Sequence, residues 1–185
     1  LKTVDMTYTR RKFIQTTALA TGSFALTGSS SARIKDGDMS PERPLFVSTW
    51  PFGKAANERS LEIFEGGGSV LDAVEMGIHV PEADASNASV GLGGIPNAEG
   101  VVQLDACIMD GEGQRAGSVA GIEDILHPIS VARKVMDETK HVMLVGEGAR
   151  QFALSQGFEK VKLLTEEQRL KWEKWKKEQH KTRYL

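Results

Sequence analysis

The sequence is poor in the residues that crosslink a chain or bind transition metals. Among its 185 residues are one cysteine, Cys107, and four histidines. A single cysteine excludes a disulfide within the chain, and its apolar neighbours in "LDACIMD" predict a buried, unreactive thiol. The histidines His79, His127, His141 and His180 do not show the spacing of a metal-binding motif. We therefore predict no metal site and no cofactor.

Several signatures of other protein classes are also missing. The segment "GGGS" at 66–69 lacks the lysine of a phosphate-binding P-loop, and no Gly-x-Ser-x-Gly nucleophile elbow occurs. The formal net charge is only −2, and the basic excess lies near the N-terminus, so the rest of the chain is mildly acidic. This charge distribution argues against nucleic acid or a membrane surface as a partner.

Residues 1–32 have the layout of an export signal. The pair Arg10 and Arg11 precedes an uncharged, moderately apolar run, and Ala32 provides a small residue suited to cleavage. The basic pair resembles that of twin-arginine signals, which predicts export to the bacterial periplasm. Met6 is then the expected initiator, with an N-terminal extension before it. The alternative is an amphipathic N-terminal helix.

Beyond the signal, the pattern predicts a linker at 33–44 and a folded α/β (α+β) region at 45–185. The run "LFVSTW" at 45–50 is typical of a strand. Helices are expected at 54–65, from Ser69 to a loop at 81–88, at 128–140, at 147–157 and from Thr165 onward. Strands are expected at 101–110 and 116–122, joined by a turn at 111–114, and as a buried strand at 141–146. Trp172 and Trp175 are expected to dock the last helix.

A glycine-rich stretch, "SVGLGG" at 89–94, is the strongest local indication of a binding site. Glycines there allow the backbone to approach a ligand closely, and Trp50 is a candidate for the same site. We expect Asp105 to hold backbone donors near the Gly93–Gly94 turn rather than to act in catalysis. No obvious nucleophile with an activating base lies nearby, so the residues indicate only part of a site.

Five long motifs, in one order, resemble the α subunit of the glycosylasparaginase family. They are "VSTWPFG" (47–53), "GGGSVLDAVEMGIHV" (66–80), "SVGLGGIPNAEGVVQLDACIMDG" (89–111), "AGSVAGIEDILHPISVARKVM" (116–136) and "HVMLVGEGARQFALSQGF" (141–158). The resemblance implies an N-terminal nucleophile hydrolase, whose fold is a four-layer αββα sandwich, here with the β-subunit half absent. Such a precursor cuts itself before a threonine, which then acts as nucleophile and supplies its own amino group as base.

The resemblance also implies the substrate, the partner and the site residues. Trp50 and Phe52 correspond to an active-site loop, Ser89 to a serine beside the nucleophile, and Thr49 to a weaker supporting position. Thr182 lacks the expected Asp-Thr or Gly-Thr junction, so the nucleophile is expected beyond Leu185. The implied substrate is a glycosylated asparagine, and the implied partner is the protein's own β subunit, in a heterodimer of αβ units.

Two alternatives remain. The first is a plant-type L-asparaginase or isoaspartyl peptidase, a branch in which a His-Gly-Gly-Ala-Gly type of segment usually stands where this chain has "STWPFG". The second is a non-catalytic, truncated fragment that keeps the fold signature without the chemistry. Expressed alone, such a chain is expected to be inactive and poorly folded, because half of the sandwich's strands would be absent and sheet edges would be exposed.

Overall fold

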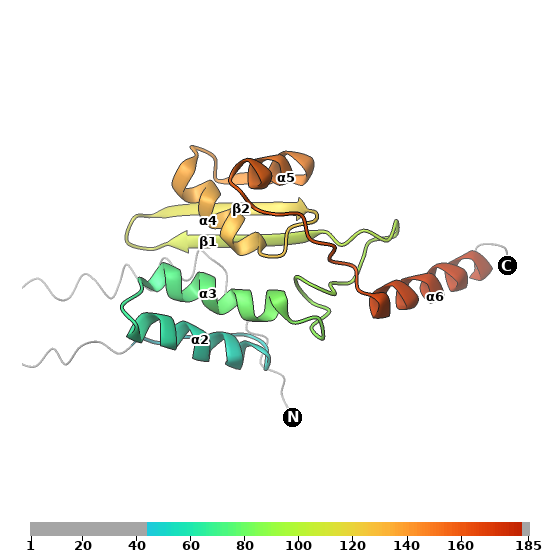
Figure 1. The fold of residues 1–185 in the computed structure, drawn as a ribbon, viewed down its shortest axis with the longest axis horizontal. Coiled ribbons are helices and arrows are strands. Elements are labelled where there is room, and N and C mark those ends of the chain that lie inside the picture. Colours follow the sequence, from blue (N-terminus) through green and yellow to red (C-terminus); the bar gives the residue numbers. More distant parts are fainter. Residues whose placement is uncertain (1–43, 183–185) are drawn as a thin grey trace, which may run out of the picture. The chain divides into compact units, whose positions relative to one another are not determined.

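The computed structural model describes residues 44–182, and Figure 1 shows their arrangement. All of them belong to the second of the two units into which the chain divides, residues 43–185. The predicted signal at 1–32, and the linker at 33–44 except for its last residue, lie outside the described residues. In the described part of the chain, no helix is both long and apolar enough to cross a membrane.

Two packed helices, α2 (Gly53–Glu65) and α3 (Val70–Ala83), confirm the first helical predictions. The turn between them contains Gly67 with φ of +91°, a conformation that favours glycine. Ser69 then caps α3: its hydroxyl accepts from the Asp72 N–H, and the Asp72 carboxylate accepts from the Ser69 N–H. The helices approach closely at Gly77, where an added Cβ would lie 2.1 Å from the Ser60 Oγ.

A three-stranded mixed sheet has the order β1-β2-β3. Strands β1 (Leu104–Asp110) and β2 (Arg115–Ile122) form the predicted antiparallel hairpin. Strand β3 (Met143–Val145) runs parallel to β2, and α4 (Pro128–Glu138) provides the crossover that a parallel connection requires. Helix α5 (Gly146–Ser155) follows β3 directly.

The core lies between α4 and the sheet. Helix α4 begins with Pro128, whose fixed φ suits the first helical turn, and it packs on β2 and β1. The predicted inward positions are all buried, namely Ile129, Ala132, Val135 and Met136. At Gly117 on β2 an added Cβ would lie 2.1 Å from the Ala132 carbonyl oxygen, so glycine allows the helix to approach the strand closely.

Helix α6 (Glu166–Thr182) contacts the loop at 95–100 mainly through Trp172, in part as predicted. The Trp172 Nε1 donates a hydrogen bond to the Ala98 carbonyl at 3.2 Å, and its ring lies against Gly100. Trp175 is exposed beside the same loop and lines a hollow with Ile95. Ion pairs between acidic and basic side chains along the helix, such as Glu167 with Lys171, lie on the solvated side.

Four local predictions were wrong. Residues 45–50 form no strand, because no strand in the described chain pairs with them, and Leu45 is 85% exposed. Helix α3 continues through Pro81 to Ala83 instead of ending before a loop at 81. Strand β3 is short and exposed, since it forms an edge of the sheet. Cys107 is exposed, because it points away from the buried face of β1.

Candidate functional site

A hollow of about 360 Å³ lies where α3 ends, β1 begins and α4 begins. Its lining includes residues from each of these elements and from the glycine-rich loop: Phe52, Glu82, Ser89, Gly91, Asp105 and Ile129. The hollow therefore combines the Phe52 loop with the segment that the sequence indicated as a binding site. Apolar walls with few polar groups are typical of ligand pockets.

The structure brings together two of the four predicted site residues. Phe52 and Ser89 line the hollow, whereas Trp50, two residues before Phe52, is 64% exposed and lines a separate hollow of about 520 Å³. Thr49 is exposed and lines neither hollow. The turn that separates Trp50 from Phe52 is closed by a hydrogen bond from the Gly53 N–H to the Trp50 carbonyl at 2.9 Å.

The glycine-rich loop is fixed against the end of α3. Gly91 has φ of +59°, and an added Cβ would lie 1.9 Å from the Glu82 carbonyl oxygen. The same oxygen accepts a hydrogen bond from the Leu92 N–H at 2.8 Å. Gly93 donates its N–H to the Leu163 carbonyl at 2.8 Å. These contacts set the position of Ser89 at the rim of the hollow.

Asp105 accepts a hydrogen bond from a backbone N–H, as predicted, but the donor does not belong to the predicted turn. Its Oδ1 accepts a hydrogen bond from the Gly121 N–H at 2.7 Å, across the β1–β2 hairpin and not at the Gly93–Gly94 turn. The register shifts between Leu104 and Ala106, so the carboxylate satisfies a backbone donor at this irregularity.

Glu82 is a buried acid on the wall of the hollow, and sequence analysis did not identify it. It comes from the last turn of α3 and is only 3% exposed. Its Oε1 accepts from the Ile129 N–H at 3.1 Å, and its Oε2 lies 2.9 Å from the His127 Nδ1. Glu82 thus caps α4, whose own N-cap residue His127 makes no capping bond with its side chain. Burial raises the pKa of Glu82, although both hydrogen bonds oppose this effect.

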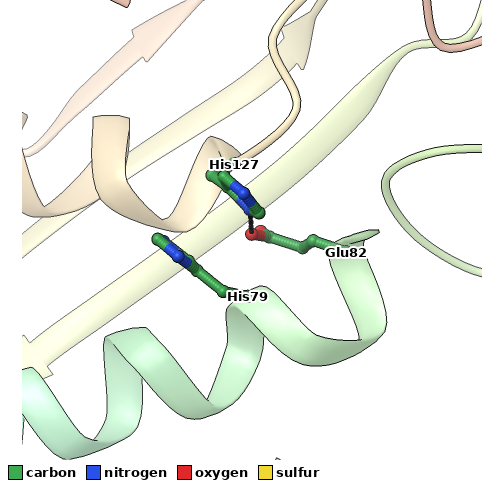
Figure 2. Close-up of side chains that lie close together, drawn as sticks. All are labelled: His79, Glu82 and His127. Atoms are coloured by element: carbon green, nitrogen blue, oxygen red, sulfur yellow. Dashed lines mark hydrogen bonds and ion pairs between the residues drawn. The ribbon is translucent and has the colours of Figure 1, made fainter. Parts of the chain in front are cut away.

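His79 and His127 stack beside Glu82, as Figure 2 shows. Their ring centroids are 3.8 Å apart and their planes differ by 13°. The His79 Nε2 lies 2.6 Å from the Ser130 Oγ, which donates to a Glu75 carboxylate oxygen. Burial, and then the neighbouring His127, lower the pKa of His79 to about 4. Packing of α3 against α4 brings these histidines together, which their distance in sequence could not show.

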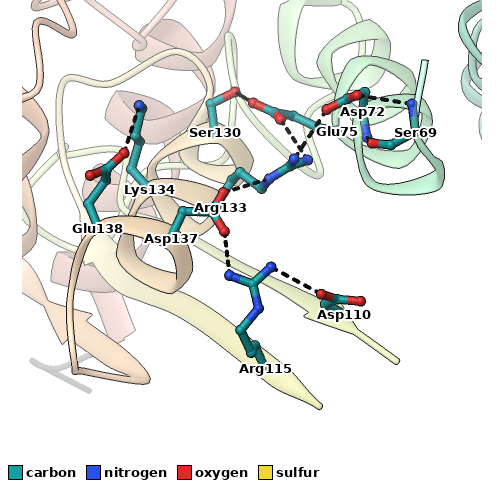
Figure 3. Close-up of polar contacts among 10 residues, drawn as sticks. All are labelled: Ser69, Asp72, Glu75, Asp110, Arg115, Ser130, Arg133, Lys134, Asp137 and Glu138. Atoms are coloured by element: carbon teal, nitrogen blue, oxygen red, sulfur yellow. Dashed lines mark hydrogen bonds and ion pairs between the residues drawn. The ribbon is translucent and has the colours of Figure 1, made fainter. Parts of the chain in front are cut away.

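An ionic network on the other side of Ser130 also joins α3 to α4 (Figure 3). The Arg133 guanidinium of α4 contacts Asp72 at 3.1 Å and Glu75 at 3.4 Å on α3, and Asp137 at 2.9 Å on its own helix. Asp137 also pairs with Arg115 of β2 at 2.9 Å. The helix pair that carries Glu82 and the histidines is therefore held by charged contacts as well as by packing.

Among the residues that line the hollow, no side-chain hydrogen bond joins a nucleophile to a base. Within residues 44–182, the hydroxyl bonded to a histidine ring belongs to Ser130, which is buried and donates its proton to Glu75. Ser89 is exposed, and its recorded bond is from its backbone N–H to the Asn87 Oδ1. The lining of the hollow can therefore orient a ligand.

Comparison with known proteins identifies the family. A family model described as asparaginase matches residues 25–184. An N(4)-(beta-N-acetylglucosaminyl)-L-asparaginase of Elizabethkingia miricola is 46% identical over 95% of this chain and 52% of the relative. The Rattus norvegicus protein of the same name is 44% identical over 71% of this chain and 38% of the relative. A plant-type L-asparaginase of Pyrococcus abyssi is 50% identical over 59% of this chain and 35% of the relative. The chain spans about half or less of the length of these relatives, and it belongs to the asparaginase family.

Proposed function

We propose that this chain is the α portion of an amidohydrolase that cleaves N-acetylglucosaminyl-asparagine to aspartate and a glycosylamine. The observation that carries the proposal is similarity over 95% of the chain to a protein named for this activity. The relative is about twice as long as the matched region, which agrees with a nucleophile located beyond Leu185. The hollow itself shows no nucleophile hydrogen-bonded to a base, which supports the same division.

In the proposed reaction, a threonine hydroxyl oxygen attacks the side-chain carbonyl carbon of the glycosylated asparagine. The threonine's own α-amino group accepts the hydroxyl proton and returns it to the leaving nitrogen as the C–N bond breaks. Water then attacks the resulting ester, which releases aspartate and restores the hydroxyl. Hydrogen-bond donors around the carbonyl oxygen would stabilise the negative charge in each step.

In this proposal Ser89 supports the incoming threonine, while Phe52 forms the wall against the amino-acid end of the substrate. Both line the same hollow, and the loop contacts of Gly91 and Gly93 hold Ser89 there. Trp50 joins the site only if its ring turns toward Phe52 when the rest of the protein is in place. Thr49, adjacent to Trp50, has the weakest support of the four residues, since it lines neither hollow.

We further propose that the rest of the protein covers the sheet face opposite α4 and so completes an αββα sandwich. Cys107, Ser118 and Met143 stand in one row across the three strands, so their side chains share a face. On this side Met109, two residues from Cys107 on β1, is 73% exposed and Met143 is 55% exposed. An exposed apolar sheet face is typical of a surface that another layer covers.

Hydrolysis of free asparagine or of isoaspartyl peptides is the second candidate function. The support is the 50% identity with the plant-type enzyme of Pyrococcus abyssi, which is confined to 59% of the chain. The glycosylasparaginase assignment is favoured because that match covers 95% of the chain, compared with 59% for the plant-type enzyme.

The test is to express the longest product of the gene and assay aspartate release from N-acetylglucosaminyl-asparagine, free asparagine and an isoaspartyl dipeptide. N-terminal sequencing of each fragment would locate any self-cleavage. We expect cleavage before a threonine beyond Leu185 and highest kcat/KM for the glycosylated substrate. Preference for either unglycosylated substrate would select the second candidate. An uncleaved, inactive product would instead support the non-catalytic fragment.

Export is a separate proposal that rests on residues 1–32 alone. We propose that Arg10 and Arg11 direct the folded protein across the bacterial inner membrane. The double variant Arg10→Lys with Arg11→Lys should retain the uncleaved protein in the cytoplasm, whereas wild type is found in the periplasm with a new N-terminus near Arg33. Periplasmic recovery of the double variant at the wild-type level would contradict the proposal.

A further inference from the structure

The cluster of His79, Glu82 and His127 provides a set of donors that no step of the proposed hydrolysis uses. One nitrogen from each histidine and one oxygen from Glu82 all lie within 4.8 Å of one another. Two of the residues come from consecutive turns of α3 and the third from the residue preceding α4. Two imidazoles and one carboxylate are a ligand set that binds zinc in proteins.

We propose that His79, Glu82 and His127 form a binding site for a divalent transition-metal ion of the zinc class. Because the stacked ring planes are nearly parallel, their in-plane lone pairs do not yet converge on one point. Metal–nitrogen bonds of about 2.0–2.1 Å place tetrahedral donors roughly 3.4 Å apart. Binding therefore requires a ring to turn, and donors that lie 4.8 Å apart must approach by about 1.4 Å.

The hydrogen bonds around the two rings indicate which nitrogen of each would bind the metal ion. Ser130 has one hydroxyl proton, and it goes to Glu75, so the His79 Nε2 must carry the proton that it shares with Ser130. The lone pair of His79 is then on Nδ1. The His127 Nδ1 lies 2.9 Å from the Glu82 Oε2, so an ion held by both groups takes the place of the proton that they share, and the His127 ring then carries its proton on Nε2. Metal-binding histidines usually donate their second nitrogen to a neighbouring polar group, as the His79 Nε2 does to Ser130.

The charge balance of the cluster also favours a cation. Glu82 is buried and its neighbours within hydrogen-bonding distance are the Ile129 N–H and a histidine, so no arginine or lysine is recorded against its carboxylate. Glu75 adds a second carboxylate behind Ser130, and Arg133 contacts that carboxylate and not Glu82.

The position of the cluster gives an ion a route to it. Glu82 lines the hollow of about 360 Å³ that also contains Phe52 and Ser89. An ion on Glu82 would therefore lie at the wall of this hollow. This inference does not depend on the proposed hydrolase activity, because its three ligands and the hydrogen bonds around them lie within residues 75–133.

The experiment is a Co²⁺ titration of the full gene product after treatment with EDTA, followed by displacement with Zn²⁺. We expect one Co²⁺ per chain at this site, visible-region absorption typical of a low-coordinate complex, and loss of that absorption when Zn²⁺ is added. The single-residue variants His79→Gln and His127→Asn should each weaken Co²⁺ affinity by at least about tenfold. The amide of His127→Asn can still donate a hydrogen bond to Glu82, so Glu82 should keep its place as the cap of α4. A loss of Co²⁺ affinity in this variant then reports the loss of a metal ligand and not the loss of the cap.

The matched control is His141→Gln, because His141 is exposed and lies outside the cluster. Its Co²⁺ affinity should equal that of the wild type. Metal-free unfolding midpoints of all variants report whether each one folds. The proposal is overturned if wild type gives no such absorption, or if folded His79→Gln and His127→Asn bind Co²⁺ as tightly as His141→Gln.

Discussion

At the scale of single residues, Gly91 is the position where a side chain is least tolerable. It combines φ of +59° with a Cβ position 1.9 Å from the Glu82 carbonyl oxygen. We expect Gly91→Ala to lower the free energy of unfolding by at least about 1–3 kcal/mol, because both backbone strain and a steric clash must be relieved. Urea denaturation of the full gene product measures the change.

The control for that variant is Gly148→Ala in α5. Gly148 has no atom within 4 Å of an added Cβ, and it is not among the residues with positive φ. Alanine is favoured over glycine in a helix by up to about 1 kcal/mol, so this variant should be neutral or slightly stabilising. Equal urea midpoints for the Gly91 and Gly148 variants would show that the loop can move away from α3.

The burial of single residues was predicted correctly from the sequence where helical periodicity determines which side chains face the core. The inward positions of α4, such as Ile129 and Val135, follow helical spacing and are buried. Glu82 and His127 could not be paired in this way, because their contact depends on how α3 packs against α4. Cys107 was placed on the wrong face, since a short apolar run does not indicate which side of a strand is covered.

At the scale of elements, the capping box of α3 makes stability depend on pH. Hydrogen bonding to Ser69, assisted by Arg133, lowers the pKa of Asp72 below its usual 3.8. The stabilisation is therefore present above the unfolded-state pKa and is lost as the pH falls through the lower folded-state value. Asp72→Asn should reduce stability at pH 7 by up to about 1 kcal/mol, since the side chain is 47% exposed and screened.

Urea titrations of wild type and Asp72→Asn at pH 7 and at pH 3 test this prediction. The difference between their unfolding free energies should shrink at the lower pH, where wild-type Asp72 begins to be protonated. Lys54→Gln provides a control, because Lys54 forms an exposed ion pair with Glu58 on α2, far from the cap. A difference for Asp72→Asn that stays constant with pH would mean that shape, and not charge, makes the cap favourable.

Trp172 makes the hydrogen bond that joins α6 to the loop at 97–100. The Trp172 ring covers Gly100, and its Nε1 donates to the Ala98 carbonyl. Trp172→Ala should increase amide hydrogen exchange throughout α6 and leave α4 unchanged, because only the helix–loop contact is removed. Trp175→Ala, which removes a more exposed ring from the same helix, should have a smaller effect. Equal exchange in both variants would contradict a specific role for Trp172.

Elements with strong local signals were predicted well, and those that depend on partners were not. Capping at Ser69 and the glycines after α2 mark the helix boundaries, and Pro128 marks the start of α4. Residues 45–50 have strand-like composition, but a strand exists only where another strand pairs with it. Pro81 remains helical because the last turn of α3 is held by the contacts of Glu82 with α4.

At the scale of the whole molecule, Cys107 reports whether another layer covers the sheet. It is exposed among the described residues, on the face that we propose the rest of the protein buries. In the native full gene product, a thiol reagent should therefore modify Cys107 at least about tenfold more slowly than in urea, since a reagent cannot reach a covered thiol. Mass spectrometry of the tryptic peptide measures the rate.

The control in this experiment is the isolated segment 43–185, provided that circular dichroism shows it to be folded. Its Cys107 should react at nearly the rate seen in urea. Rapid modification in the native full product would contradict coverage of this face, and it would leave the sheet two-layered. The result is independent of enzymatic activity, so it separates the architecture from the proposed chemistry.

The continuity of the core has a consequence for biosynthesis. Every residue of the buried cluster lies between Val102 and Leu163, so one unbroken stretch of chain supplies it. Contacts that are close in sequence form quickly, and domains can fold while the ribosome is still adding residues. The cluster can thus assemble as soon as this stretch leaves the ribosomal tunnel. Whatever follows Leu185 would then be synthesised beside a template that has already taken shape.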